Sequence, residues 1–176
     1  MLDLDAEMHP CPRGELAHRA ELVSRGGREQ IPFLVDPNTG EQLYEAPRIV
    51  RHLFERYGDG RVPRGLLSPL GLRRSHLASR LRGHTGDQKR PARRPERPLE
   101  LFGYEAGPHT RLVREQLSTF ALPWISRTRA HGSPRRASLE QEIGCRRFPV
   151  LRDPNTGRVV ADSDLIRAYL TVTYGR

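Results

Sequence analysis

Two stretches of the chain decide the fold: residues 31–58, IPFLVDPNTGEQLYEAPRIVRHLFERYG, and residues 148–175, FPVLRDPNTGRVVADSDLIRAYLTVTYG. They align without a gap at an offset of 117 residues, and 11 of the 28 positions are identical. The identities include the proline at the second position, the central Asp-Pro-Asn-Thr-Gly block and the closing Tyr-Gly pair. Because self-similarity at a fixed offset is the signature of a repeat, the sequence predicts two copies of one module.

Each copy has the pattern of a β-hairpin followed by a helix. Ile31-Pro32 and Phe148-Pro149 open short apolar runs, which end in the Asp-Pro-Asn-Thr-Gly turn. Proline presets φ there, and Asn and Gly tolerate positive φ. A second short strand is expected at 42–44 and 159–161, followed by a helix that Tyr-Gly ends. The apolar faces predicted for the two helices are Ile49, Val50, Leu53 and Phe54 in the first copy, and Leu165, Ile166, Tyr169 and Leu170 in the second.

Upstream of the second copy the sequence predicts two strand–helix pairs. A strand is expected over 99–104, and a helix after Gly107-Pro108, because proline suits the first helical turn. A strand over 124–128 and a helix over 134–143 follow, which gives the order βαβαββα and an α/β fold class. The apolar face expected for the first of these helices comprises Leu112, Val113, Gln116, Leu117 and Phe120.

The first copy has only part of this pattern. Ala6 to Pro10 matches the second strand and Gly14 to Ser24 the second helix, so the initial strand and helix are missing. We therefore expect a partial unit at 1–60, an Arg/Pro-rich linker at 61–98 and a complete unit at 99–176. Within the linker, Arg82–Pro98 is predicted to be flexible, and the apolar residues of Leu66–Leu81 suit a short helix that packs on one unit.

Composition sets broad limits on function. The chain has 176 residues, of which 36% are hydrophobic and 6% aromatic, which suits two small cores better than one large core. The formal net charge is +9, and Lys89 is the only lysine. The arginine excess has two explanations that composition cannot separate, a GC-rich genome and recognition of anions.

The remaining sequence-wide features indicate a protein of a reducing compartment, by default the cytoplasm. Cys11 and Cys145 form no CxxC pair, so neither a disulfide framework nor a metal site is expected. No apolar run approaches the ~18 residues of a membrane span, and the acidic opening MLDLDAEMHP is not a signal peptide.

The X-Pro step, followed by Asp162-Ser163 at the start of the last helix, resembles the amino-terminal thioredoxin-like domain of glutathione S-transferases. Residues 104–115, YEAGPHTRLVRE, are similar to YEASPFCRLVRE, which precedes and opens the active-site helix in tandem proteins with two such domains. The whole chain outside the linker resembles those tandem proteins, with the first domain truncated at its N-terminus. The resemblance implies glutathione as ligand and cis bonds before Pro32 and Pro149.

Two departures from the family pattern affect the chemistry. Where the family has Ser or Cys, Pro, an aromatic and Cys, this chain has Gly107, Pro108, His109 and Thr110, so no thiol is left at the helix N-terminus that would stabilise a thiolate. In the first copy the Glu-Ser step has become Glu45-Ala46, which removes a hydroxyl that would hold the γ-glutamyl group.

The resemblance implies the following ligand-binding residues: Gly107, Pro108, Phe148, Pro149, Asp162 and Ser163. Thr110 and His109 are the catalytic candidates, Thr110 as a hydrogen-bond donor to a bound thiolate and His109 as a donor or acid. Each has a structural alternative, an ordinary place in the first helical turn. Asp162-Ser163 likewise suits either carboxylate binding or plain N-capping.

Three functional hypotheses follow. The first is a glutathione S-transferase-like protein that binds glutathione or a thiol-containing protein with little or no catalysis, with self-association left open. The second is an active glutathione transferase or thiol oxidoreductase, through Thr110, through Cys145 as a monothiol, or through a CxxC-type motif encoded upstream of Met1. The third is a basic nucleic-acid-binding protein, for which the sequence has arginines but no recognisable motif. Cys11 is expected to be a lone thiol in a loop, and the pair Arg146-Arg147 suits either contact with an anionic ligand or a solvated loop.

Overall fold

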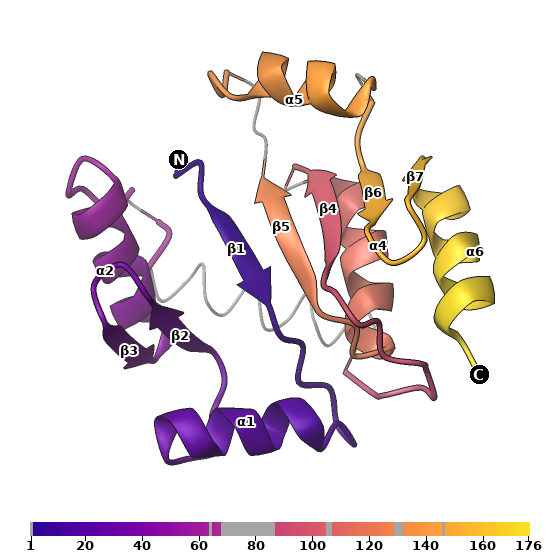
Figure 1. Cartoon of the computed structure of the whole chain (residues 1–176). Helices are drawn as coiled ribbons and strands as arrows, with labels where there is room; N and C mark the ends of the chain where they lie inside the picture. The colour runs from indigo at the N-terminus through magenta and orange to yellow at the C-terminus, as the bar shows by residue number, and fades with distance from the viewer. Residues whose placement is uncertain (1, 64, 68–86, 105–106, 129–131, 146) are drawn as a thin grey trace. The chain divides into compact units, whose positions relative to one another are not determined.

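The computed structural model describes residues 2–63, 65–67, 87–104, 107–128, 132–145 and 147–176, which Figure 1 shows in colour. These residues group into two compact units. The amino-terminal unit includes residues 16–63, and the carboxy-terminal unit includes residues 3–15 together with the described residues from 87 onward. Within the described residues, no helix has the length and apolar character needed to cross a membrane.

The carboxy-terminal unit has the mixed α/β order βαβαββα that the sequence predicts, with one additional strand. A five-stranded sheet has the order β1-β5-β4-β6-β7, in which β4 is parallel to β5 and antiparallel to β6 (Figure 1). This is the arrangement of a thioredoxin-like domain with a strand added beside β5. The elements are β1 (Asp5–Met8), β4 (Leu99–Gly103), α4 (Pro108–Thr119), β5 (Trp124–Thr128), α5 (Arg136–Ile143), β6 (Val150–Asp153), β7 (Arg158–Ala161) and α6 (Ser163–Tyr174).

Helices α4 and α6 pack together on one face of this sheet and enclose its main core. Val113 and Leu117 of α4 meet Ile166 and Leu170 of α6, and all four side chains are completely buried. Each pair is four residues apart, so it lies on one stripe of its helix. The sequence-based faces were wrong at two positions: Leu112 is 36% and Leu165 63% exposed, because each lies one residue before that stripe.

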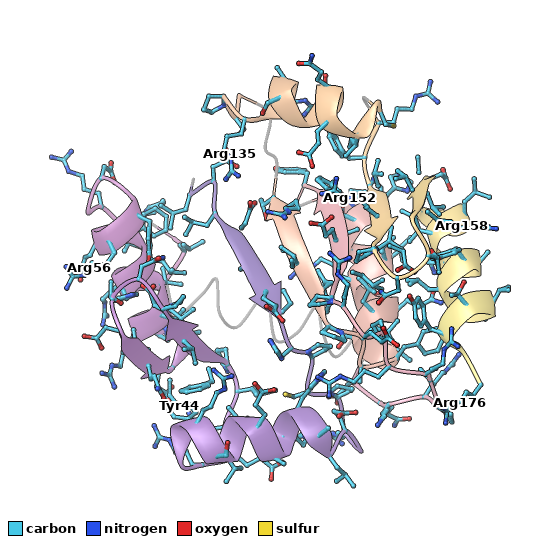
Figure 2. The ribbon with its side chains drawn as sticks, viewed as in Figure 1. Tyr44, Arg56, Arg135, Arg152, Arg158 and Arg176 are labelled. Atoms are coloured by element: carbon cyan, nitrogen blue, oxygen red, sulfur yellow. The ribbon has the colours of Figure 1, made fainter. Side chains whose placement is uncertain are left out.

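The opposite face of the sheet carries a small apolar cluster and a network of side-chain ion pairs. Phe102 and Val150 are buried there, next to Ile143 and Phe148. Beside them, the carboxylate of Glu100 on β4 accepts hydrogen bonds from two arginines, Arg127 of β5 at 2.7 Å and Arg152 of β6. On one side Arg127 also pairs with Asp5, which pairs in turn with Arg135, and on the other side Arg152 pairs with Glu142. Figure 2 labels Arg135 and Arg152.

Strand β1 belongs to the carboxy-terminal unit, although the sequence assigns residues 1–60 to the first unit. It pairs antiparallel with β5, with Asp5 opposite Arg127 and Met8 opposite Trp124. An ion pair of 2.8 Å between Asp5 and Arg127 and the packing of Met8 on the main core hold it there. The predicted strand over Ala6–Pro10 therefore exists, shifted to Asp5–Met8, with a pairing partner that its sequence does not reveal.

Residues 87–98 of the predicted linker are held against the carboxy-terminal unit, which differs from the flexible chain expected over Arg82–Pro98. The backbone N–H of Arg90 donates to Thr119 at 2.8 Å, and that of Arg93 to Tyr174 at 2.7 Å. Asn155 of the hairpin turn accepts from the backbone of Arg97 at 2.8 Å. Backbone hydrogen bonds form independently of side-chain polarity, so composition alone did not indicate this attachment. The short helix predicted over Leu66–Leu81 lies almost wholly outside the described residues.

The described part of the amino-terminal unit consists of two helices and a two-stranded antiparallel hairpin: α1 (Ala17–Gly26), β2 (Phe33–Asp36), β3 (Glu41–Tyr44) and α2 (Ala46–Tyr57). Tyr44, labelled in Figure 2, joins the hairpin to α1. Its hydroxyl donates to the carbonyl of Arg28 at 2.9 Å, and its ring lies 4.5 Å from that of Phe33. A Cβ at Gly26 would lie 1.9 Å from this hydroxyl, so the close packing of α1 on β3 requires glycine there.

Residues 31–58 and 148–175, hereafter the first and second repeat segments, have elements with the same bounds at the offset of 117. Strands β2 and β6, strands β3 and β7, and helices α2 and α6 all begin and end at equivalent residues. Both X-Pro bonds are cis, and both helices follow a residue at positive φ, Glu45 at 70° and Asp162 at 78°.

A buried aspartate explains why both segments begin their turn with Asp and end their helix with Tyr-Gly. In the second segment Asp153 is 1% exposed, and its Oδ2 atom accepts hydrogen bonds from Tyr169 at 2.6 Å and Tyr174 at 2.5 Å. Burial raises the pKa of Asp153, but the bonds from the two tyrosines and from Asn155 outweigh it and hold that pKa below its ordinary value. The aspartate thus fastens the hairpin to the helix.

In the first segment a buried aspartate also joins the hairpin to the helix, but one of its two side-chain partners on the helix is a different residue type. Asp36 accepts from Tyr57 at 2.6 Å, and its other oxygen lies 2.7 Å from Nε2 of His52. His52 stands where the second segment has Tyr169. The hydrogen bond from Tyr57 is the main cause that lowers the pKa of Asp36 well below its usual range.

Candidate functional site

The start of α4 holds four of the residues that the sequence analysis singled out, Gly107, Pro108, His109 and Thr110. Gly107 is the N-cap residue in an extended conformation, and it offers the helix no side-chain cap. Pro108 and His109 are exposed in the first turn, whereas Thr110 is only 5% exposed. The uncapped N-terminus concentrates positive partial charge at this point of the surface.

Thr110 points toward strand β4. A Cβ at Gly103 would lie 2.6 Å from Cγ2 and 2.8 Å from Oγ1 of Thr110, so the side chain fills the space that this glycine leaves. A Cβ at Gly107 would lie 3.3 Å from the same hydroxyl and 3.0 Å from the carbonyl oxygen of Tyr104. Gly103, Gly107 and Thr110 therefore form one packed group, in which the threonine hydroxyl is turned inward.

The start of α6 is connected to the start of α4 by a side-chain hydrogen bond. Nδ1 of His109 lies 3.3 Å from the hydroxyl of Ser163, which is 4% exposed. Asp162 caps α6: its Oδ1 atom accepts from the backbone N–H of Asp164 at 2.8 Å and of Leu165 at 3.4 Å. The sequence left capping and ligand binding open for this pair, and the structure shows Asp162 making the capping contacts.

The cis-proline step completes the constellation. The backbone N–H of Asp162 donates to the carbonyl of Pro149 at 3.3 Å, which joins the step to the start of α6. Pro149 is buried and Phe148 half-buried. The structure thus brings together all three sequence-predicted segments: Gly107–Thr110, Phe148-Pro149 and Asp162-Ser163.

The sequence analysis did not single out Arg136, the first residue of α5. Its guanidinium carbon lies 5.3 Å from the centre of the Phe148 ring, a cation–π distance that places positive charge beside the cis-proline step. The available signal was weak, because an arginine among 30 basic residues at the start of a helix is not distinctive.

The two cysteines lie in different settings. Cys145 is half-buried beside the Phe102–Val150 cluster, and its Sγ donates to the carbonyl of Arg147 at 3.3 Å. Cys11 lies in the loop after β1, with its Sγ 3.6 Å from the carbonyl of His9. Arg147 is exposed, and Arg146 lies outside the described residues.

Across the described ranges no group of three or more His, Cys, Asp or Glu side chains could hold a metal ion.

The first repeat segment has only part of this arrangement. Its cis step is Ile31-Pro32, and Ile31 is 57% exposed. Ala46 occupies the position of Ser163 without a hydroxyl, and the carboxylate of Glu45 accepts a hydrogen bond from Gln30. The described part of the amino-terminal unit contains no counterpart of α4, so the only complete constellation among the described residues is in the carboxy-terminal unit.

Comparison with solved structures gives two partial alignments. A glutathione transferase from Phanerochaete chrysosporium aligns at 25% identity and a TM-score of 0.36, over 43% of this chain and 38% of its own. A glutathione S-transferase of Ceriporiopsis subvermispora, solved in complex with glutathione, aligns at 24% identity and a TM-score of 0.36, over 43% of this chain and 37% of its own. The alignment thus spans about two fifths of either enzyme. No curated protein matches the chain.

Comparison with family models is more extensive. The model of the glutathione S-transferase N-terminal domain matches two separate segments, residues 1–61 and residues 101–176, which together make up well over half of the chain. The second of these contains the whole constellation of α4, the cis-proline step and α6. The chain belongs to the glutathione S-transferase N-terminal domain family.

Proposed function

We propose that the carboxy-terminal unit binds glutathione, or a cysteinyl segment of a thiol-containing protein, with little or no catalysis. The observation that carries the proposal is the meeting of two helix starts and a cis-proline step, with a glycine at the position where the family carries its redox residue. Helix N-termini favour carboxylates, and glutathione has two.

In this proposal the γ-glutamyl carboxylate binds at the start of α6. The hydroxyl of Ser163 donates to it, which requires the serine oxygen to accept its own hydrogen bond from Nδ1–H of His109. The Phe148 backbone beside Pro149 takes the main chain of the cysteinyl residue, as the family resemblance implies. His109 is thus a positioning residue for Ser163.

The same geometry supports weak or absent turnover. The dipole and free N–H groups of a helix N-terminus stabilise a thiolate, and a side-chain donor at the sulfur adds to that stabilisation. Gly107 has no side chain, and the Thr110 hydroxyl is turned toward Gly103. A ligand thiol at the start of α4 would meet only the helix dipole and the backbone N–H groups.

The proposal also covers the origin of the two repeat segments and the cellular compartment of the protein. We take the two repeat segments as copies of one module, of which the first lacks a counterpart of β4 and α4 among the described residues. Since glutathione is the thiol buffer of reducing compartments, we place the protein in the cytoplasm.

Titration calorimetry with reduced glutathione tests the proposal, together with a conjugation assay using a chloronitrobenzene electrophile. We expect measurable binding, no conjugation above the uncatalysed rate, and about tenfold weaker binding for Ser163→Ala, which removes one charge-assisted hydrogen bond. Ala46→Ser is the matched control: it adds the hydroxyl at the equivalent position of the first segment, and affinity should not change. Efficient turnover, or binding that Ser163→Ala leaves intact, would contradict the proposal.

A further inference from the structure

The net charge of the chain lies entirely in one segment, residues 61–98. This segment contains 11 of the 30 basic residues and 2 of the 21 acidic ones, so its formal charge is +9. The rest of the chain contains 19 residues of each sign and is neutral overall. An excess of one sign that is confined to one segment favours a partner of the opposite charge at that place.

The described end of this segment, residues 87–98, is fixed to the carboxy-terminal unit through its backbone. The N–H of Arg90 donates to the carbonyl of Thr119, the last residue of α4. The N–H of Arg93 donates to the carbonyl of Tyr174, the last residue of α6. The carbonyl groups at a helix end lack partners within the helix, and here the main chain of residues 87–98 supplies them. The arginine side chains of the segment are not needed for this attachment.

Side chains of these arginines differ from those on the sheet in having no acidic partner. Arg127 and Arg152 both pair with Glu100. Four exposed guanidinium groups, by contrast, have no carboxylate partner in the described structure: those of Arg90, Arg94, Arg97 and Arg176. Figure 2 labels Arg176, whose backbone N–H donates to the carbonyl of Pro91 at 3.3 Å. The four groups are therefore available to an anion from outside.

The remainder of the chain does not supply the missing negative charge. Residues 64 and 68–86, the part of the linker outside the described ranges, contain five arginines and no Asp or Glu. A second copy of the chain has the same +9 in the same segment and is neutral elsewhere, so it is not a complementary partner. The exposed arginines therefore favour a separate, anionic molecule.

The composition and rigidity of residues 87–98 favour phosphate groups at fixed spacing. The planar guanidinium group donates two parallel hydrogen bonds to a phosphate. No large apolar side chain is exposed within this segment, although protein partners usually dock on such anchors. The segment also has no aromatic residue on which the bases of a single strand could stack. A row of arginines that is already held in place loses little entropy on binding a rigid duplex.

We propose that Arg90, Arg94, Arg97 and Arg176 form a binding surface for the phosphate backbone of double-stranded nucleic acid. Contacts to phosphate carry no sequence information, so binding does not depend on base sequence. The surface lies at the carboxy-terminal ends of α4 and α6, whereas the candidate glutathione site lies at their starts. Each helix has 12 residues, so the two ends are about 18 Å apart. Nucleic-acid binding is thus separate from the proposed binding of glutathione.

Fluorescence anisotropy of a labelled DNA duplex, titrated with the full chain at increasing salt, tests the proposal. If four arginines each neutralise one phosphate, the logarithm of the binding constant should fall against the logarithm of the salt concentration with a slope of about −3.6 or steeper. Between about 50 and 200 mM salt, this slope gives a loss of affinity of about a hundredfold. Two duplexes of unrelated sequence should bind equally well.

Paired charge variants sharpen the test. Arg94→Gln with Arg97→Gln should make the slope shallower by about 1.8 and leave glutathione binding unchanged. The control is Arg48→Gln with Arg51→Gln on α2, because both arginines are exposed and the change in net charge is the same. This control should leave the slope as it is. An unchanged slope for the first pair, an equal change in the control, or tighter binding to polyglutamate or to phosphatidylserine vesicles than to the duplex at the same salt would overturn the proposal.

Discussion

The two repeat segments have the same backbone plan, but their equivalent apolar residues are buried to different extents. Each folds into a hairpin and a helix with equivalent bounds, and each fastens its helix to its turn through a buried aspartate. Among the residues that the structure describes, α6 has a neighbouring helix on its apolar stripe, through the contact with α4, and α2 has none. The comparison teaches that the local sequence determines the shape of the module, whereas deep burial of its leucines depends on a strand and helix that lie elsewhere in the chain.

The largest expected effect comes from truncating the leucine that α2 and α6 carry at equivalent positions, Leu53 and Leu170. Leu170→Ala should destabilise the carboxy-terminal unit by about 3 kcal/mol, because it leaves a cavity between α4, α6 and the sheet. Leu53→Ala at the half-buried equivalent position should cost the amino-terminal unit only about 1 kcal/mol. Urea unfolding followed by Trp124 fluorescence reports the first change, and hydrogen exchange in α2 the second. Equal costs would remove the distinction between the segments.

Replacing the aspartate of the second segment should have the next largest effect. All the groups that hydrogen-bond to the Asp153 carboxylate are donors: Tyr169 and Tyr174 at Oδ2, and the backbone and side chain of Asn155 at Oδ1. In Asp153→Asn the new NH₂ group would face donors on either side. We expect a loss of about 2 kcal/mol in the free energy of unfolding, measured by urea titration. Asp162→Asn, at an exposed cap that asparagine also fills, is the matched control and should cost a few tenths of a kcal/mol.

Acid should weaken both units, with the onset set by carboxylates whose pKa is lowered. Burial raises the pKa of Glu100, but hydrogen bonds from Arg152 and Arg127 bring it below its ordinary value, and Asp153 and Asp36 are lowered as well. For such groups the stabilisation is fully present above the unfolded pKa of about 4 and is lost as pH falls through the folded pKa. The urea midpoint should therefore be flat from neutral pH to about 5 and should fall steeply below about 4. Asp153→Asn should make that fall shallower, and an unchanged slope would contradict this assignment.

The smallest expected effect comes from making the two aspartate sites alike. His52→Tyr introduces the residue of the second segment, where the Tyr169 hydroxyl also lies 2.8 Å from Thr156. Thr39 is the equivalent threonine, so the new hydroxyl has the same two potential partners. The free energy of unfolding of the amino-terminal unit should change by less than about 1 kcal/mol, as measured by hydrogen exchange in α2. A larger loss would show that the two aspartate sites have different surroundings.

Much of the fold was predictable because the same residue pattern occurs in both repeat segments. The Asp-Pro-Asn-Thr-Gly turn, the cis-proline positions and the Tyr-Gly helix ends follow from local residue types and the family resemblance. The limits of periodicity are clear at Leu112 and Leu165, where an apolar residue beside the buried stripe was assigned to the core. Whether such a residue is buried depends on how the helix is rotated about its own axis, and the hydrophobic pattern does not fix that rotation to within one residue.

The candidate site was predictable as a set of positions but not as a set of contacts. The sequence indicated Thr110, His109 and Ser163, yet it did not indicate that Thr110 packs on Gly103 or that His109 reaches Ser163. Such contacts join residues many positions apart. The pairing of β1 with β5 is of the same kind, because four residues of mixed polarity do not specify their partner.

The position of β1 has a consequence for biosynthesis. Its residues leave the ribosome before those of β5, its partner, which is made more than a hundred residues later, after residues 16–63 of the amino-terminal unit. Bringing such distant strands together carries a large loop-closure entropy and slows folding. Residues 5–8 therefore cannot pair with β5 until the intervening chain has been synthesised.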